Sequence, residues 1–182
     1  MRIISGQWRS RPIIAPKGDT TRPTADRTRE TLFSMLTSRL GSFEDLRVLD
    51  LFAGSGALGL EALSRGAAHC TFVEQDALAL DALAANINKL GAKDQSDVRK
   101  SSVLSLGTAI KPADIVLMDP PYLSGAGSVA LDKLVRFGWF APSAWISVET
   151  SIKEDVDVKG FTIDTVRNVG KAKLTLLRPA GI

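Results

Sequence analysis

Cysteine and histidine are nearly absent from this sequence of 182 residues, which contains one of each, Cys70 and His69. A single cysteine excludes an intramolecular disulfide framework, and so few thiol and imidazole groups exclude a Cys/His metal cluster. We interpret both as packing residues on or beside a buried strand. No apolar run approaches the length of a membrane span, and the first residues lack the apolar core of a signal peptide. We therefore expect a cytoplasmic monomer that needs no metal and no membrane.

The sequence also has little net charge, with a formal value of only +3, but the charged residues are unevenly distributed along the chain. Residues 1–30 contain seven Lys and Arg against three acids, so this segment carries +4 and the rest of the chain carries −1. A basic segment on a near-neutral body is typical of proteins that bind a polyanion. A solvated polar lead-in has the same composition, and charge alone leaves that alternative open. We expect an N-terminal extension over residues 1–23 that contacts RNA, followed by one domain over 24–182.

Short apolar segments alternate with helical patterns from residue 46 onward. Strands are predicted over 48–52, 70–73, 98–103, 114–118 and 145–148, with helices over 58–65, 77–90 and 130–137. Two further segments, 161–166 and 174–177, predict a closing antiparallel hairpin. Such alternation predicts an α/β fold, a Rossmann-like, seven-stranded and mostly parallel sheet. Before it, residues 2–16 predict a small hairpin, and Thr24 is the expected cap of a helix that ends near Leu40.

A glycine-rich loop follows the first predicted strand. Gly54, Gly56 and Gly59 satisfy the pattern G-x-G-x-x-G, and Glu74 lies 20 residues beyond Gly54. Glycines allow a tight turn and a close approach to a ligand, and a carboxylate after the second strand can bind ribose hydroxyls. Asp50, before the glycines, suits the cationic sulfonium of S-adenosylmethionine and disfavours a pyrophosphate. A nicotinamide dinucleotide, or a tight turn without a ligand, are the alternatives.

The tetrapeptide Asp119-Pro120-Pro121-Tyr122 follows the apolar run at 115–118. Its prolines have fixed φ angles and no N–H to donate. The result is a stiff turn of hydrogen-bond acceptors beside one aromatic ring. Asp119 and the Pro120 carbonyl can accept the two N–H bonds of a planar amino group while Tyr122 stacks on its ring. A sharp strand exit without chemistry is the alternative.

Three longer segments match one family in order. They are R-I-I-S-G-Q-W-R-S-R at 2–11, R-P-T-A-D-R-T-R-E-T-L-F at 22–33, and 50–66 with the glycine loop. Together with D-P-P-Y they cover nearly the whole chain, which resembles the bacterial 16S ribosomal RNA guanine-N2 methyltransferases. The N-terminal signature is the most specific part, because DNA amino-methyltransferases share only the last two elements.

This resemblance implies a class I fold, S-adenosylmethionine as cofactor, and 16S rRNA of the assembling small subunit as partner. The residues that would hold the cofactor are Asp50, Ala53, Gly54, Ser55, Gly56, Glu74, Gln75, Ser102 and Val103. The target guanine would be held by the catalytic residues Asp119, Pro120, Pro121 and Tyr122. The nucleic acid would be contacted by Arg9, Arg11, Arg22 and Arg27. The chain departs from the family after the third strand, where Ser102 replaces an acid, and at Val169-Gly170-Lys171, to which we assign no role.

Several alternatives remain open at this point. A DNA adenine-N6 or cytosine-N4 methyltransferase shares the amine-acceptor chemistry, although the chain has no room for a target-recognition domain. An RNA-binding assembly factor without catalysis is the alternative from another class. Trp8 can pack in the core or stack on a base. The stretch containing Gly125 and Gly127 can be a mobile substrate loop or a plain connector.

Overall fold

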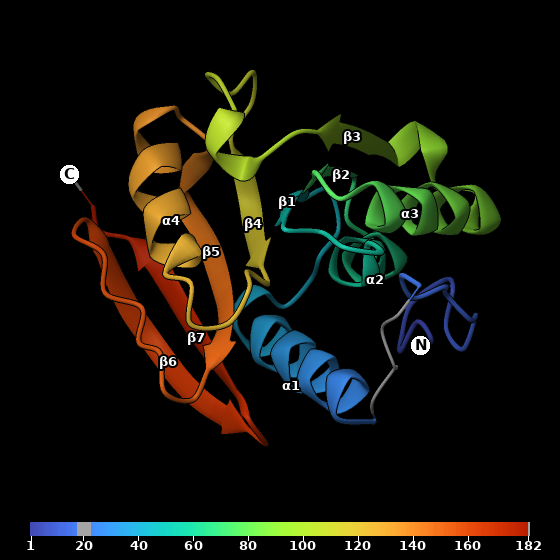
Figure 1. The fold of residues 1–182 in the computed structure, drawn as a ribbon, viewed down its shortest axis with the longest axis horizontal. Helices are drawn as coiled ribbons and strands as arrows, with labels where there is room; N and C mark the ends of the chain where they lie inside the picture. The colour runs from blue at the N-terminus through green and yellow to red at the C-terminus, as the bar shows by residue number, and fades with distance from the viewer. Residues whose placement is uncertain (18–22, 182) are drawn as a thin grey trace.

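A seven-stranded mixed sheet forms the centre of the molecule in the computed structural model, which describes residues 1–17 and 23–181 (Figure 1). Its strands are β1 (Arg47–Leu51), β2 (His69–Glu74), β3 (Ser96–Lys100), β4 (Ala113–Met118), β5 (Phe140–Ser151), β6 (Phe161–Val169) and β7 (Ala172–Pro179). They lie in the order β3-β2-β1-β4-β5-β7-β6. The first five are parallel, and β7 pairs antiparallel with both β5 and β6. The predicted Rossmann-like sheet with a closing hairpin is confirmed.

Helices cover both faces of this sheet. They are α1 (Pro23–Leu40), α2 (Ala57–Ser64), α3 (Ala77–Leu90) and α4 (Ala126–Arg136), with the short 3-10 turns η1 (Lys93–Gln95) and η2 (Val103–Ser105). Helices α1, α2 and α3 pack in one hydrophobic cluster, and α4 packs with η2 in a second cluster on the opposite face. Because both faces are covered, the central strands are continuous apolar runs rather than alternating ones.

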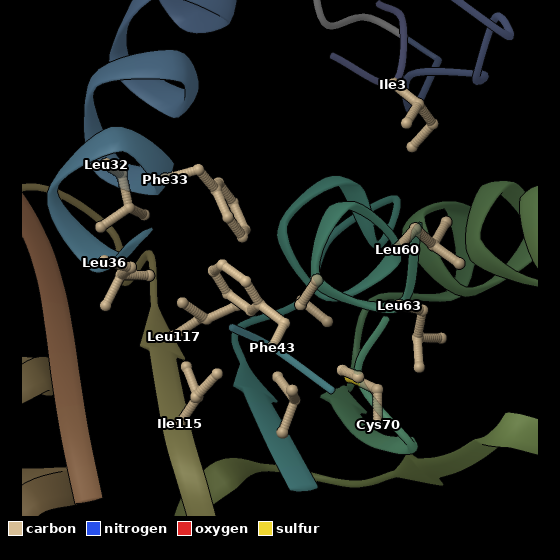
Figure 2. Packing of buried hydrophobic residues seen from close by; sticks show 14 of the residues in the cluster. Ile3, Leu32, Phe33, Leu36, Phe43, Leu60, Leu63, Cys70, Ile115 and Leu117 are labelled. Carbon is tan, nitrogen blue, oxygen red and sulfur yellow. The ribbon is translucent and has the colours of Figure 1, made fainter. Parts of the chain in front are cut away.

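Strand β4 contributes side chains to both hydrophobic clusters. Ile115 and Leu117 point toward α1 and α2, whereas Val116 and Met118 pack with α4. Figure 2 shows Leu117 beside Phe43, with Phe33 of α1 above them, Ile115 below, and Cys70 of β2 further along the same face. Cys70 is fully buried, in agreement with its predicted packing role. The two-residue period of the strand therefore assigns its side chains to opposite layers.

The N-terminal segment, residues 1–17, lies against α2 and α3 (Figure 1). The fully buried carboxylate of Glu61 on α2 accepts hydrogen bonds from the backbone N–H groups of Ile4 and Ser5, at 2.8 and 3.0 Å. Trp8 is buried in the same cluster, so its predicted packing role is confirmed. The expected hairpin is present in short form: an antiparallel bridge joins Arg2 and Pro12, and the N–H groups of Ile3 and Ile13 donate to the carbonyls of Arg11 and Met1, both at 3.0 Å.

Four predicted boundaries were wrong. Strand β3 ends at Lys100, and Val103 belongs to η2, because this edge strand is polar and only partly buried. Helix α4 begins at Ala126, so Gly127 lies inside a helix rather than in a mobile loop. Helix α1 begins at Pro23, a residue whose fixed φ suits the first helical position, which places Thr24 within the first turn instead of at the cap. Strand β5 begins at Phe140, five residues before the predicted start.

Candidate active site

The glycine-rich loop between β1 and α2 has an alternating left-handed backbone. Phe52, Gly54 and Gly56 have φ angles of 59°, 57° and 85°. A left-handed φ is unfavourable for residues with a side chain, so glycine suits two of these positions and Phe52 is held there under strain. Gly59 serves a different purpose: a Cβ at this position would lie 2.4 Å from the Phe72 ring. Helix α2 can therefore pack closely on β2.

Glu74, at the end of β2, holds this loop and the start of the next one. Its Oε2 accepts a hydrogen bond from the N–H of Gly54 at 2.8 Å. Its Oε1 accepts from the N–H groups of Gln75 and Asp76, at 2.8 and 2.9 Å. The carboxylate and the glycine loop, each expected to hold the cofactor, are thus joined by a hydrogen bond in the fold.

Glu74 and Gln75, predicted to hold the cofactor, and the D-P-P-Y turn, predicted to hold the base, line one cavity of about 500 Å³. Its lining residues are Phe52, Glu74, Gln75, Asp76, Asp119, Pro120, Pro121, Tyr122 and Glu149. The cavity lies where the strand order reverses between β1 and β4, which is where ligands bind in open α/β sheets. Its volume is that of a typical small-molecule site. The D-P-P-Y turn and Glu74 therefore face the same space.

Tyr122 is tied to Glu149 across this cavity. The Tyr122 hydroxyl donates a hydrogen bond to Glu149 Oε1 at 2.8 Å. Burial raises the pKa of the Glu149 carboxyl, and the Tyr122 hydroxyl partly offsets this by stabilising the ionised form. Burial and the nearby Glu149 charge raise the pKa of the Tyr122 phenol, so this hydroxyl stays protonated and acts as a donor.

Asp50 lies beneath the loop and does not line the cavity. Its side chain is fully buried, and Oδ2 accepts a hydrogen bond from the N–H of Gly59 at 2.9 Å. Oδ1 has no hydrogen-bond partner in the described part of the chain. Burial raises the pKa of Asp50 well above its ordinary value, and the charges of Asp119 and Glu74 raise it further. We expected Asp50 beside the ligand, whereas its side chain contacts the backbone of Gly59 in the first turn of α2.

The remaining predicted cofactor residues are also set back from the cavity. Ala53 and Ser55 are buried in the loop. Ser102 caps η2 by accepting from the N–H of Leu104, and Val103 is buried in the cluster beneath α4. None of these four lines the cavity, and neither do the predicted Gly54 and Gly56.

Three of the four predicted RNA-contacting arginines are described by the structure, and these three lie on the surface of the N-terminal part of the chain. Arg9 and Arg27 are exposed, and exposed Arg11 donates to the backbone carbonyl of Lys89 at 2.9 Å. Arg22 lies outside the described residues. Arg29 is different, because it is buried against Glu61 and donates to the carbonyl of Arg2, which makes it part of the scaffold.

Sequence reasoning missed three acidic residues of the site: Asp76 and Glu149, which line the cavity, and Glu154, which supports the turn beside it. Glu149 lies inside β5, and nothing in its local sequence distinguishes it from other strand residues. Glu154, after β5, accepts hydrogen bonds from the N–H groups of Leu123 and Gly125, at 2.6 and 3.0 Å. Leu123 has a left-handed φ of 58°, so this carboxylate holds a strained turn just behind Tyr122.

The fold, the glycine loop and the D-P-P-Y turn place the chain among the class I methyltransferases. A magnesium protoporphyrin IX methyltransferase from Synechocystis, solved with bound S-adenosylmethionine, shares this fold at a TM-score of 0.66 and 14% identity, covering 89% of this chain and 86% of its own. Over residues 1–178 the sequence matches the family described as "Conserved hypothetical protein 95", and the chain belongs to that family.

Two relatives are much more similar. The ribosomal RNA small subunit methyltransferase D of Escherichia coli is 41% identical over 153 residues, which cover 84% of this chain and 76% of the relative. A solved structure described as a putative methyltransferase from Escherichia coli has a TM-score of 0.86 and 36% identity, covering 100% of this chain and 99% of the other. The protein is a methyltransferase.

Within the described ranges, the structure contains no cluster of three or more acidic, histidine or cysteine side chains arranged to hold a metal ion. A search of the same residues finds no helix with the length and apolar character needed to cross a membrane.

Proposed function

We propose that this chain transfers a methyl group from S-adenosylmethionine to the exocyclic N2 of a guanine in 16S rRNA of the assembling small subunit, as a cytoplasmic monomer. The observation that carries the proposal is the shared cavity. Glu74 and Phe52, the first residue of the glycine loop, bound one side of it, and Asp119 to Tyr122 bound the other. A methyl donor and an amino-group acceptor bound on these two sides would be in contact. The names of the ribosomal RNA methyltransferase relatives support RNA as the substrate class.

The residues of the cavity fit S-adenosylmethionine better than a dinucleotide. Glu74, Asp76, Asp119 and Glu149 all contribute carboxyl groups to its lining. Such a set favours a cationic ligand and repels a pyrophosphate. Glu74 would hold the ribose hydroxyls, and the backbone of the loop near Gly54 would approach the ligand closely. When bound, the cofactor supplies an electrophilic methyl group on a sulfonium.

Asp119 and Pro120 would hold the acceptor. The N2 lone pair of guanine is delocalised into the ring, which makes this nitrogen a poor nucleophile. Acceptance of its two N–H bonds by the Asp119 carboxylate and the Pro120 carbonyl favours a pyramidal nitrogen and stabilises the positive charge that develops on it. Tyr122, 46% exposed, would stack on the base after it leaves its own stack. Positioning of this kind contributes up to roughly 7–11 kcal/mol in favourable systems.

Asp50 would act through the loop rather than by direct contact. Its hydrogen bond to Gly59 fixes the first turn of α2 against β1. The Pro120 side of the site has similar support, because the Asp119 N–H lies 3.5 Å from the carbonyl oxygen of Leu51, at the end of β1. The two halves of the cavity are therefore anchored on the same strand.

The test is methyl transfer from labelled S-adenosylmethionine to three substrates: free 16S rRNA, undermethylated small subunits and duplex DNA. Labelled nucleosides are then identified by mass spectrometry. We expect N2-methylguanosine from free rRNA or from small subunits. Whichever of these two substrates is methylated faster shows at which stage of assembly the modification occurs. N6-methyladenine from DNA would show that the proposed rRNA substrate is wrong, while the proposed transfer of a methyl group to an exocyclic amine would stand. No transfer despite cofactor binding in calorimetry would favour a non-catalytic assembly factor.

A further inference from the structure

Glu149 occupies the position next to Asp119 on the neighbouring strand. Met118 of β4 pairs with Val148 of β5 in a parallel register. Asp119 and Glu149 are the residues that directly follow this pair, so they lie side by side. Both line the same cavity. The site that would hold the amino group of a base thus carries a second carboxylate directly beside the first.

The hydrogen bonds of Glu149 leave one of its oxygens available to a ligand. Oε1 accepts from the Tyr122 hydroxyl at 2.8 Å, and this is its one hydrogen bond to the part of the chain that the structure describes. An ionised carboxylate only accepts hydrogen bonds, and Oε2 can accept further ones. A donor on the ligand is therefore the complement that this oxygen requires.

The three bases that carry an exocyclic amino group differ in the ring atom beside that group. Guanine has an N1–H donor next to N2, whereas adenine and cytosine have a ring nitrogen with a lone pair. A base that has been extruded from its stack is read by hydrogen bonds to this edge. A carboxylate attracts the N1–H of guanine and is repelled by the lone pair of the other two bases.

We propose that Glu149 selects guanine, by accepting the N1–H of the base whose amino group is held by Asp119 and Pro120. This inference rests on the proposed function and deepens it. The D-P-P-Y turn recognises an amino group and is by itself indifferent to which base carries it. Glu149 adds the discrimination, and Tyr122 orients the carboxylate through the hydroxyl hydrogen bond while its ring stacks on the base.

The test compares guanine with 2-aminopurine at the methylated position of an RNA, after the labelling experiment has mapped that position. 2-Aminopurine keeps the 2-amino group but has a lone pair at N1. With the full-length wild-type chain we expect kcat/KM to favour guanine by about 100-fold, as for other well-formed base contacts. In Glu149→Gln the amide can donate to the N1 lone pair, so we expect this preference to fall by about 10-fold or more.

Tyr122→Phe is the matched control, because it removes the hydroxyl contact to Glu149 and keeps the aromatic ring and the carboxylate. Because the carboxylate is kept but loses the hydroxyl that orients it, this variant should slow transfer to both bases and lower the preference for guanine less than Glu149→Gln does. Circular dichroism melting establishes that both variants fold. If Glu149→Gln slows both bases equally and keeps the preference, Glu149 only supports Tyr122 and the inference is wrong. Failure of the proposed function looks different: the wild-type chain would form no N2-methylguanosine in RNA, and the inference would fall with it.

Discussion

The Asn86 side chain of α3 donates a hydrogen bond from Nδ2 to the carbonyl oxygen of Ser55, in the glycine loop, at 3.0 Å. The same amide group also binds the N-terminal segment. Its Oδ1 accepts from the N–H of Ile14 at 2.7 Å, and its Nδ2 donates to the Ile14 carbonyl at 2.8 Å. Asn86 is fully buried. One side chain therefore ties the basic N-terminal segment to the loop that would hold the cofactor.

Asn86→Ala should weaken cofactor binding and loosen the N-terminal segment together. The substitution leaves the buried carbonyl of Ser55 without this partner, at a cost of about 1–3 kcal/mol, and removes both contacts to Ile14. We expect S-adenosylmethionine affinity in calorimetry to fall by about 10-fold, and limited proteolysis to cleave within residues 1–17. Asn88→Ala, an exposed change on the same helix, is the control. If the affinity for S-adenosylmethionine is unchanged and only the melting temperature falls, Asn86 contributes to stability and not to cofactor binding, and the prediction is wrong.

Asp50→Asn should make the stability of the chain less sensitive to pH. Burial raises the pKa of Asp50 in the folded state, so the folded state binds its proton more tightly than the unfolded state. The contribution of this group is favourable below the unfolded pKa and is lost as pH rises toward the folded pKa. The asparagine does not titrate, and its Oδ1 can still accept from Gly59.

Urea unfolding between pH 4 and pH 8 measures this effect. The free energy of unfolding of Asp50→Asn relative to wild type should increase with pH. Asp81→Asn, on the exposed side of α3, should show no such trend. A difference between Asp50→Asn and wild type that stays constant with pH would contradict the prediction.

Asp119→Ala should abolish methyl transfer while cofactor affinity stays within about 3-fold of wild type. The carboxylate is assigned to the acceptor amino group, and removing one such group in other enzymes costs about 100- to 1000-fold in rate. Transfer is followed with labelled cofactor, and affinity by calorimetry. Equal loss of affinity and of rate would show that Asp119 also holds the cofactor.

Arg9→Ala combined with Arg27→Ala should reduce the salt dependence of RNA binding. Both side chains are exposed on the N-terminal part of the chain. If each contacts one phosphate, the slope of log K against log salt should become shallower by about 1.4, since each contact to a single strand contributes about 0.7. Arg167→Ala, exposed on β6, is the control. An unchanged slope would mean that the RNA is bound elsewhere.

The sequence was sufficient for features set by local pattern. Apolar runs bounded by polar residues identified all seven strands, and the glycine loop and D-P-P-Y marked the two sides of the cavity. Glu149 could not be predicted, because its position depends on the register between β4 and β5, two segments about 30 residues apart. Ser102 was misplaced with respect to the cavity because the weak pattern of β3 hides where that strand ends.

The role of Glu154 could not be predicted from the local sequence either, because its partners lie about 30 residues earlier in the chain. Its two carboxylate oxygens accept from the backbone N–H groups of Leu123 and Gly125, so this one side chain holds two backbone groups of the turn behind Tyr122. Glu154→Gln keeps the size of the side chain but replaces one acceptor with a donor that faces an N–H group. Charge-assisted hydrogen bonds of this kind contribute about 1.5–3 kcal/mol.

We therefore expect Glu154→Gln to lower kcat/KM for RNA by about 10-fold, because the D-P-P-Y turn loses its fixed position. The affinity for S-adenosylmethionine should stay near that of wild type, since Glu154 does not line the cavity. Glu44→Gln, an exposed change before β1, is the matched control. A comparable loss of cofactor affinity in Glu154→Gln would show that the turn and the glycine loop move as one unit, and the division of the cavity into a donor side and an acceptor side would then be wrong.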